Sequence, residues 1–414
     1  MSWPLVPISE LCELAIDCVN KTAPVVPYET PYKMIRTTNI KGGFINTKDV
    51  RYVTKETFDK WTRRSRPRFG DVILTREAPV GEVGRCTFSD EEYIFLGQRL
   101  FQYRPDPNKL DWNFLAYVLQ SPEVQGRLHG HSFGATVPHV KVGDAENLHI
   151  PCPTLQEQKR IGSALAAYDD LIENNRRRIE LLEEAARRLY REWFVHLRFP
   201  GHEDVKVVDG KPVGWERKPL SSVVKVNERN IGSKERPDEV LYIDISSVSP
   251  GVIQEVTRYD FADAPGRARR RVAHGDVIWS CVRPNRRSYA LVWEPDEKLV
   301  ASTGFAVLTA KAVPFSYLYF ATTTDAFVAH LEANATGATY PAVTAKTFED
   351  VEMLVPDEET LNGFSEVVLP QLEQIEMLKR QNKLLAKARD ALLPKLMSGQ
   401  LDVSGIPMPE LEAA

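Results

Sequence analysis

A heptad seam between Gln156 and Leu197 limits the possible folds more than any other feature of the chain. Apolar residues recur there at gaps of four and three, with Glu and Arg on the flanks, as in a coiled-coil helix. Asn175 occupies the expected seam position inside the one seven-residue gap. A stripe this narrow cannot bury itself, so the helix requires a partner. The seam residues are Ile161, Leu165, Tyr168, Ile172, Ile179, Leu182, Ala186, Leu189 and Trp193.

The predicted partner is a second heptad stretch from Glu358 to Met397, with Asn382 on its seam. Each helix of about 40 residues is roughly 60 Å long. Because a globular segment connects the end of the first helix to the start of the second, we expect antiparallel packing. That arrangement predicts two globular domains at opposite ends of a rod, related by approximate two-fold symmetry. The second seam consists of Leu361, Phe364, Val368, Ile375, Leu378, Leu385 and Leu392.

The segments before the two helices repeat each other, which indicates an internal duplication. The turn-to-strand step Phe69–Ile73 matches His274–Ile278 at an offset of 205 residues. The Gly/Thr loop 132–138 matches 335–341, and the Pro-ended strand 148–153 matches 351–356, both at an offset of 203. Short β-branched strands broken by Gly, Pro and Asn turns predict a mixed, twisted sheet in each copy.

The predicted fold class is α+β, with two tandem α/β domains that are each followed by a long helix. The Pro-Gly step at Pro200–Gly201 marks the boundary between the copies. The predicted limits are residues 1–153 for the first domain, 154–200 for the central helix, 201–356 for the second domain, and 357–414 for the last helix and tail.

Composition narrows the functional classes. The formal net charge of −4 hides basic stretches, with 15 Lys and Arg against 9 Asp and Glu from Lys33 to Arg104, and seven Arg against one Asp from Pro265 to Trp293. Local basic clusters are typical of a protein that binds a polyanion at particular sites, although solvated loop charges explain them equally well. Five cysteines without a CxxC pair, no long apolar run and no signal-like N-terminus predict a cytoplasmic protein.

Catalytic and metal motifs are weak. The sequence has no phosphate-binding Gly-Lys-Ser/Thr loop, no GxGxxG, and no Asn/Asp-Pro-Pro-aromatic tetrapeptide of the amino-methyltransferase type. Pro295–Lys298 lacks the spacing of a nuclease carboxylate box and is read as a turn. His129, His131 and His139 lack other metal ligands at suitable spacing. Gly70–Asp71 and Gly275–Asp276 are read as turns. We therefore expect no cofactor, no metal and no catalysis.

The loops instead offer side chains that can bind base edges and phosphates. They combine Arg, Lys, Asn, Ser and Thr with Gly, and they are where the two copies differ most. Each residue taken singly also fits an ordinary turn or helix cap. The candidate DNA-binding residues are Arg36, Thr38, Asn39, Lys41, Thr75, Arg76, Arg99, Thr136, His139 and Lys141 in the first copy, and Ser246, Ser247, Arg283, Asn285, Arg286, Arg287, Thr303 and Thr339 in the second.

The chain resembles the specificity subunit of type I restriction-modification enzymes. The stretch Ile150–Ile161, Ile-Pro-Cys-Pro-Thr-Leu-Gln-Glu-Gln-Lys-Arg-Ile, is similar to the family's entry into its central conserved helix. Phe69–Leu74 and the Gly-Ala-Thr loops are similar to its target-recognition domains. The resemblance covers nearly the whole chain, but Val355–Leu361 lacks the Gln-Lys/Arg pair of the family's helix entry.

This resemblance implies a noncatalytic subunit that reads an asymmetric, bipartite double-stranded DNA target, one domain per half-site. It implies that two modification subunits, which methylate adenine, dock on the charged helix faces, and that restriction subunits join them. Solvated coiled-coil flanks are the alternative explanation of those faces. A DNA enzyme that carries methylation and cleavage on one chain, and a coiled-coil scaffold without DNA specificity, are the competing functions.

Overall fold

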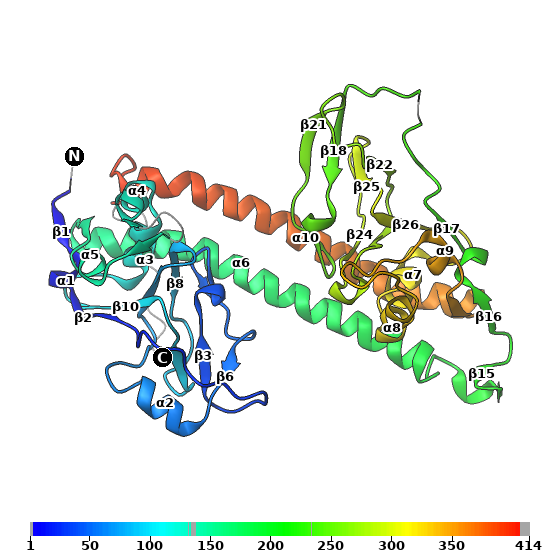
Figure 1. Cartoon of the computed structure of the whole chain (residues 1–414), viewed down its shortest axis with the longest axis horizontal. Helices are drawn as coiled ribbons and strands as arrows, with labels where there is room; N and C mark the ends of the chain where they lie inside the picture. The colour runs from blue at the N-terminus through cyan, green and yellow to red at the C-terminus, as the bar shows by residue number, and fades with distance from the viewer. Residues whose placement is uncertain (1–2, 131, 134–137, 233, 406–414) are drawn as a thin grey trace. The chain divides into compact units, whose positions relative to one another are not determined.

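The structure, a computed structural model, describes residues 3–130, 132–133, 138–232 and 234–405. It divides into two compact units (Figure 1). Unit 1 comprises Met1–Asn175 and Arg380–Ala414, and unit 2 comprises Arg176–Lys379. Each unit therefore contains one globular domain together with a segment of each long helix.

Both predicted long helices are present. They are α6 (Leu155–Tyr190), which continues into the π-helical turn η2 (Arg191–Val195), and α10 (Glu358–Met397). The predicted first helix was expected to run to Leu197, but Leu197 has a positive φ of 59° and ends it. Most of the predicted seam is buried, and the buried members include Ile161, Leu165 and Ile172.

The helices pack antiparallel within each unit. In unit 1, the Asn175 Nδ2 donates to the Asn382 Oδ1 at 2.9 Å, and Asp169 on α6 is paired with Arg389 on α10. In unit 2, the rings of Trp193 and Phe364 lie 5.9 Å apart, and the Lys379 Nζ lies 3.9 Å from a carboxylate oxygen of Glu183. Residue numbers rise along one helix as those of its partner fall, which confirms the predicted direction of packing.

The domain of unit 1 is built on two sheets, not on the single mixed sheet that the sequence predicts. One has the order β2-β10-β7-β8 and is antiparallel throughout. The other has the order β6-β3-β9, in which β3 and β9 are parallel. The strands are β1 (Leu5–Pro7), β2 (Cys12–Asp17), β3 (Lys33–Ile35), β4 (Ile40–Lys41), β5 (Phe44–Ile45), β6 (Arg51–Tyr52), β7 (Val72–Arg76), β8 (Val80–Arg85), β9 (Ile94–Leu96), β10 (Leu100–Pro105), β11 (Ser132–Phe133), β12 (His139–Val140) and β13 (His149–Pro151).

Short helices complete this domain. Figure 1 shows α3, α4 and α5 grouped together, and α2 on the side of β3 and β6, apart from those three helices. Apolar side chains of α3, β7 and β10 form the main core of unit 1 with Ile161 and Leu165 of α6, so the helix is part of the domain's core. The helices are α1 (Ile8–Leu11), η1 (Thr37–Asn39), α2 (Lys55–Trp61), α3 (Trp112–Gln120), α4 (Pro122–Gly130) and α5 (Val142–Glu146).

Unit 2 repeats this plan. Its sheets have the orders β17-β26-β23-β24 and β21-β18-β25-β22, and β18 is parallel to β25. Its strands are β14 (Val207–Val208), β15 (Lys211–Pro212), β16 (Glu216–Pro219), β17 (Val224–Val226), β18 (Glu239–Ile243), β19 (Val248–Ser249), β20 (Val252–Ile253), β21 (Thr257–Asp260), β22 (Ala268–Arg271), β23 (Val277–Ser280), β24 (Tyr289–Leu291), β25 (Leu299–Ser302), β26 (Phe305–Ala310) and β27 (Glu352–Val355). Its short helices are η3 (His202–Asp204), η4 (Leu220–Ser222), η5 (Ile245–Ser247), η6 (Pro284–Arg286), α7 (Phe315–Ala321), α8 (Asp325–Ala333) and α9 (Ala345–Glu349).

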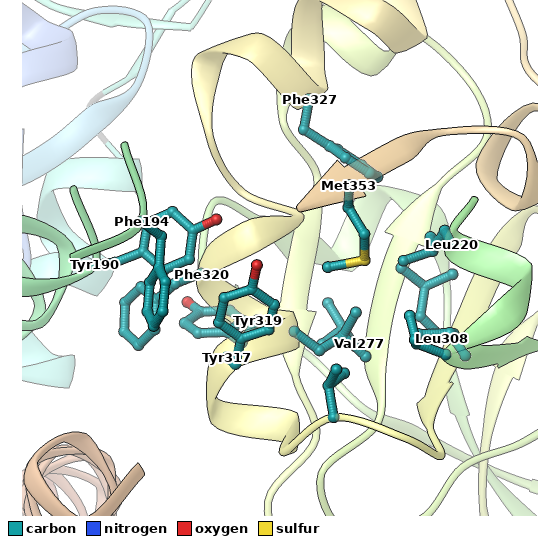
Figure 2. Packing of buried hydrophobic residues seen from close by; sticks show 14 of the residues in the cluster. Tyr190, Phe194, Leu220, Val277, Leu308, Tyr317, Tyr319, Phe320, Phe327 and Met353 are labelled. Atoms are coloured by element: carbon teal, nitrogen blue, oxygen red, sulfur yellow. The ribbon is translucent and has the colours of Figure 1, made fainter. Parts of the chain in front are cut away.

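An aromatic cluster joins the helices of unit 2 to its domain. Figure 2 shows Tyr190 and Phe194 beside the aromatic residues of α7. The ring of Phe194 lies 4.8 Å from that of Tyr317 and 5.0 Å from that of Phe364 on α10. Burying each such ring contributes roughly 1.5–3 kcal/mol, so the domain is held firmly on its helical segment.

The units differ in the segment that precedes β7 in unit 1 and β23 in unit 2. Unit 1 has the helix α2 there, whereas unit 2 has β22, which adds a fourth strand to its second sheet. Within the described part of the chain, no helix is both long and apolar enough to cross a membrane.

Candidate DNA interface

Loops from four parts of unit 1 meet at one end of the sheet β2-β10-β7-β8. The Thr37 Oγ1 donates to the Ala78 carbonyl at 3.0 Å, and the Arg76 N–H donates to the Arg99 carbonyl at 2.9 Å. A β-bridge pairs Glu77 with His139. These contacts bring together residues 36–41, 75–80, 97–99 and 138–141, which we call the unit 1 loop cluster.

Unit 2 makes the matching contacts at matching positions. The Cys281 N–H donates to the Gly304 carbonyl at 2.8 Å, which corresponds to the Arg76–Arg99 bond at an offset of 205 for both partners. Val282 forms a β-bridge with Ala342, corresponding to Glu77 and His139 at offsets of 205 and 203. Residues 245–247, 281–287, 302–304 and 335–342 form the unit 2 loop cluster.

Gly304 explains why the η5 loop approaches this cluster closely. A Cβ on Gly304 would lie 2.1 Å from the Cδ1 of Ile245. The absence of a side chain at residue 304 therefore allows η5 to pack against the start of β26, beside the loop that carries Arg283.

The predicted residues of unit 1 fall into two groups. Thr38, Lys41, Arg99, His139 and Lys141 are exposed on the loop cluster. The predicted residue Thr136 lies outside the described residues.

The other group is buried or committed to internal contacts. Thr75 is fully buried, and its Oγ1 accepts the Glu82 N–H at 2.9 Å. The amide of Asn39, which is 4% exposed, accepts the Arg36 N–H and donates to the carbonyls of Asn46 and Asp49. Thr75 and Asn39 therefore shape the loops, because a buried side chain cannot reach a ligand from this conformation.

Arg76, at the end of β7, and Arg99, just before β10, also have protein partners. The Arg76 Nη1 donates to the Val140 carbonyl at 2.9 Å, which ties β7 to β12. The Arg99 Nε lies 3.3 Å from a carboxylate oxygen of Glu77, and Arg99 has a positive φ of 69°. Arg36 is half-buried at the start of η1.

In unit 2, Ser246, Asn285, Arg286, Thr303 and Thr339 are exposed on the loop cluster. Ser247, Arg283 and Arg287 are half-buried there. All the predicted residues of this half therefore lie in one cluster.

Some of these residues have internal roles. Both the N–H and the hydroxyl of Ser246 donate to Asp244. Burial opposes ionisation of Asp244, but the hydrogen bonds from Ser246 and Tyr242 hold its pKa below the usual value. Arg287 forms a 2.5 Å ion pair with Asp325 on α8.

The basic stretch from Pro265 to Trp293 is partly structural. Arg271 pairs with Glu235 at 2.6 Å, and the Arg270 Nη1 donates to the Asn230 side chain at 2.8 Å. Burial also lowers the pKa of Arg270. Local charge counts therefore overstate the positive charge that this stretch presents to solvent.

Two exposed residues were not among the predicted DNA-binding residues. Tyr340 lies in the unit 2 loop cluster, and Arg267 lies next to it. The Arg267 carbonyl accepts the Thr303 N–H at 2.8 Å, which places Arg267 beside a predicted residue. Tyr340 is 65% exposed and lies beside Arg283. The signal that the sequence offered for Tyr340 was an aromatic residue next to the candidate Thr339 in a Gly/Thr loop.

The segments whose residues superficially resemble catalytic motifs form turns in the structure. The Asp296 side chain accepts the Lys298 N–H at 2.8 Å, so Pro295–Lys298 is a turn. Gly70 and Gly275 have φ of 84° and 82°, and the Asp that follows each glycine is buried. No group of three His, Cys, Asp or Glu in the described ranges could hold a metal ion, and His131 lies outside those ranges.

The chain is similar to known proteins of one type. The model of the family described as "type I restriction modification DNA specificity domain" matches residues 2–184. The chain is 25% identical to the type I restriction enzyme MjaIX specificity subunit of Methanocaldococcus jannaschii, over 85% of this chain and 82% of that protein. It is 22% identical to the EcoKI specificity subunit of Escherichia coli K12, over 93% of this chain and 82% of that protein.

The fold agrees with this relationship. The crystal structure of the type I restriction-modification S subunit from M. genitalium matches with a TM-score of 0.57 at 18% identity, and the match covers 95% of this chain and 96% of that one. The match extends over both domains and both long helices. Residues 2–184 of the chain therefore match the family of type I restriction-modification specificity domains, and most of the chain is similar to type I specificity subunits.

Proposed function

We propose that this chain is the DNA-reading subunit of a type I restriction-modification complex and that it directs adenine methylation and restriction by partner subunits. The unit 1 loop cluster reads one half of a bipartite target, and the unit 2 loop cluster reads the other. The chain itself carries out no catalysis and binds no cofactor. Its partners are double-stranded DNA, two modification subunits and the restriction subunits.

One observation carries this proposal most strongly. Two copies of one fold hold corresponding loops together by the same backbone contacts, while the side chains on those loops differ. Arg76 and Glu77 of unit 1, for example, stand where unit 2 has Cys281 and Val282. A shared scaffold with different polar loops is suited to two different half-sites, so the target is asymmetric.

The charge of the loops is suited to this role. The charged side chains Arg99 and Lys141 of unit 1 and Arg286 of unit 2 are exposed, and so is the polar Thr339 of unit 2. Arg and Lys bind phosphates and guanine, while Ser, Thr and Asn bind either base edges or backbone oxygens. A coiled-coil scaffold without DNA specificity would have no use for such loops at the same place in both units.

The test is to express the chain with the modification subunit of its own system and to map methylated adenines in host DNA by long-read sequencing. We expect a single asymmetric bipartite motif with a fixed spacer, and no methylation at that motif when the chain is omitted. Methylation that is independent of the chain, or an active complex without a bipartite motif, would contradict the proposal.

A further inference from the structure

The two loop clusters share one unusual backbone position. Ala78 has φ of 50° and Arg283 has φ of 51°, at an offset of 205, and each is followed by proline. A positive φ is uncommon for a residue other than glycine and is maintained only where surrounding structure enforces it. The duplicated fold therefore repeats this strained position in both units and fills it with different side chains, a methyl group in unit 1 and a guanidinium in unit 2.

The backbone of Arg283 is fixed by the Gly/Thr loop. Its N–H donates to the Pro341 carbonyl at 2.7 Å. Its neighbour Val282 forms the β-bridge with Ala342. The loop that carries Arg283 and the loop that carries Tyr340 are thus joined at the arginine and at the residue before it.

The guanidinium is held in place by the same loop. The Arg283 Cζ lies 4.5 Å from the centre of the Tyr340 ring, and the Nη2 donates to the Thr339 carbonyl at 3.3 Å. Stacking on an aromatic ring leaves the edge of the guanidinium, which carries its other N–H donors, available to a ligand. Because Tyr340 is 65% exposed, this pair stands at the surface of the cluster.

Arg283 differs in this respect from the nearby Arg287. Arg287 is engaged by the carboxylate of Asp325. Among the residues that the structure describes, no carboxylate oxygen lies within 4.0 Å of the Arg283 guanidinium. A ligand would therefore meet a preorganised cation without first breaking an ion pair.

The edge of a planar guanidinium matches the O6 and N7 acceptors of guanine, and a fork of two hydrogen bonds to these atoms is the commonest specific contact of arginine with DNA. We propose that Arg283 reads a guanine in the half-site of unit 2, and that Tyr340 is the residue that positions it. This inference rests on the proposed function. The methyl side chain of Ala78 cannot form a hydrogen bond, so unit 1 has no side-chain contact with guanine from the matching position.

The test uses the full complex and duplexes that contain its methylation motif. Each guanine of the motif is replaced in turn by 7-deazaguanine, which lacks the N7 acceptor. For the wild type, we expect that at one guanine of the unit 2 half-site the substitution weakens binding. For Arg283→Ala, binding should be insensitive to that substitution and discrimination at that base pair should fall by about 5- to 150-fold. Alanine should be tolerated at residue 283 because the alanine at the matching position, Ala78, has nearly the same positive φ.

Two further variants separate positioning from folding. Tyr340→Ala should relax the same base pair, while Tyr340→Phe, which keeps the stacking ring, should retain the wild-type motif. Arg258→Ala removes the same charge from a 70% exposed side chain that pairs with Glu239 at the start of β18, and it should leave the motif unchanged.

The proposal is overturned if the unit 2 half-site contains no guanine. It is also overturned if Arg283→Ala weakens binding equally to all sequences, which is the behaviour of a phosphate contact. If the wild-type complex has no bipartite motif at all, the proposed function fails, and the two failures are therefore distinguishable.

Discussion

At the scale of single residues, the Gly-Asp steps show what a local motif can predict. The sequence predicts turns at Gly70–Asp71 and Gly275–Asp276, and the structure confirms them. It gives no sign that the carboxylate of Asp276 is 1% exposed and accepts bonds from Arg229, Thr309 and the Ala273 N–H. Arg229 is 47 residues away in the chain, so the partner depends on the fold.

We predict that Asp276→Ala lowers the free energy of unfolding by about 3 kcal/mol, because the Arg229 guanidinium and the Thr309 hydroxyl lose their hydrogen-bond acceptor. Asp350→Ala is the matched control, since Asp350 forms only a surface pair with Lys346 and should change stability by less than about 0.5 kcal/mol. Urea unfolding of the full chain measures both. Equal effects would show that the buried network contributes nothing special.

Cys281 provides a test of burial within the unit 2 loop cluster. Burial raises the pKa of Cys281 to about 11. The folded state therefore keeps the proton longer than the unfolded state. The neutral thiol contributes stability below pH 9, and this contribution is lost as the pH rises towards 11.

We expect iodoacetamide at pH 8 to label Cys281 at least about 100-fold more slowly in the folded protein than in urea, because the thiolate is the reactive form. Peptide mass spectrometry follows each cysteine separately. Labelling of Cys281 within tenfold of its rate in the unfolded chain would contradict the shift in its pKa.

Positive φ angles at residues other than glycine could not be predicted from the sequence. Nothing in the sequence distinguishes Ala78 from an ordinary loop alanine, because a positive φ is imposed by tertiary contacts. Tyr340 likewise carries no periodic signal. Thr75 has the same composition cue as the exposed Thr38, yet it is fully buried, since facing directions depend on strand register.

At the scale of elements, the long helices were predictable because a heptad seam repeats over many turns and averages out local exceptions. The strand pairings were less predictable than the helices. The parallel pairs β3–β9 and β18–β25 join segments separated by about 60 residues, and nothing local specifies such a partner. The division of each domain into two sheets follows from these pairings.

The crossing of α6 and α3 depends on Gly162. A Cβ there would lie 2.5 Å from the Asp111 Oδ1 and 2.7 Å from the Phe114 nitrogen, the two atoms of the α3 cap. We predict that Gly162→Ala destabilises the chain by about 2 kcal/mol, although alanine favours helix by about 1 kcal/mol.

Gly126→Ala in α4 is the control for Gly162→Ala. A Cβ at Gly126 meets no atom within 4 Å, so this change should stabilise the chain by about 0.5–1 kcal/mol. Thermal and urea unfolding measure the two variants side by side. If both variants stabilise the chain, the helix crossing is not limited by close contact.

The seam asparagines lead to a prediction of non-additivity. Asn175 is 1% exposed, and its amide donates to Asn382 and Gln381. Asn175→Leu should lower the free energy of unfolding by about 1–3 kcal/mol, because the side-chain oxygen of Asn382 loses its donor. Asn175→Leu with Asn382→Leu should recover the wild-type stability or exceed it. Additive losses in a double-mutant cycle would show that the two amides act independently.

At the scale of the whole molecule, a net charge of −4 is compatible with DNA reading because positive charge is concentrated at particular loops. Overall acidity disfavours indiscriminate binding, and in the proposed function local Arg and Lys side chains supply the contacts at the target. The sequence could predict this division of charge, but only the structure shows that Arg270 and Arg271 are engaged internally while Arg286 is exposed.

The last prediction concerns the independence of the two units in the proposed function. Each loop cluster is held together by contacts inside its own unit, between residues such as Thr37 and Ala78, or Arg283 and Pro341. Replacing residues 1–153 with the corresponding segment of another specificity subunit should therefore change one half of the methylated motif and preserve the other half and the spacer. Replacing residues 201–356 should change the opposite half. Methylome sequencing reads both outcomes directly, and an exchange of one segment that alters both halves would show that the target is read jointly by the two units.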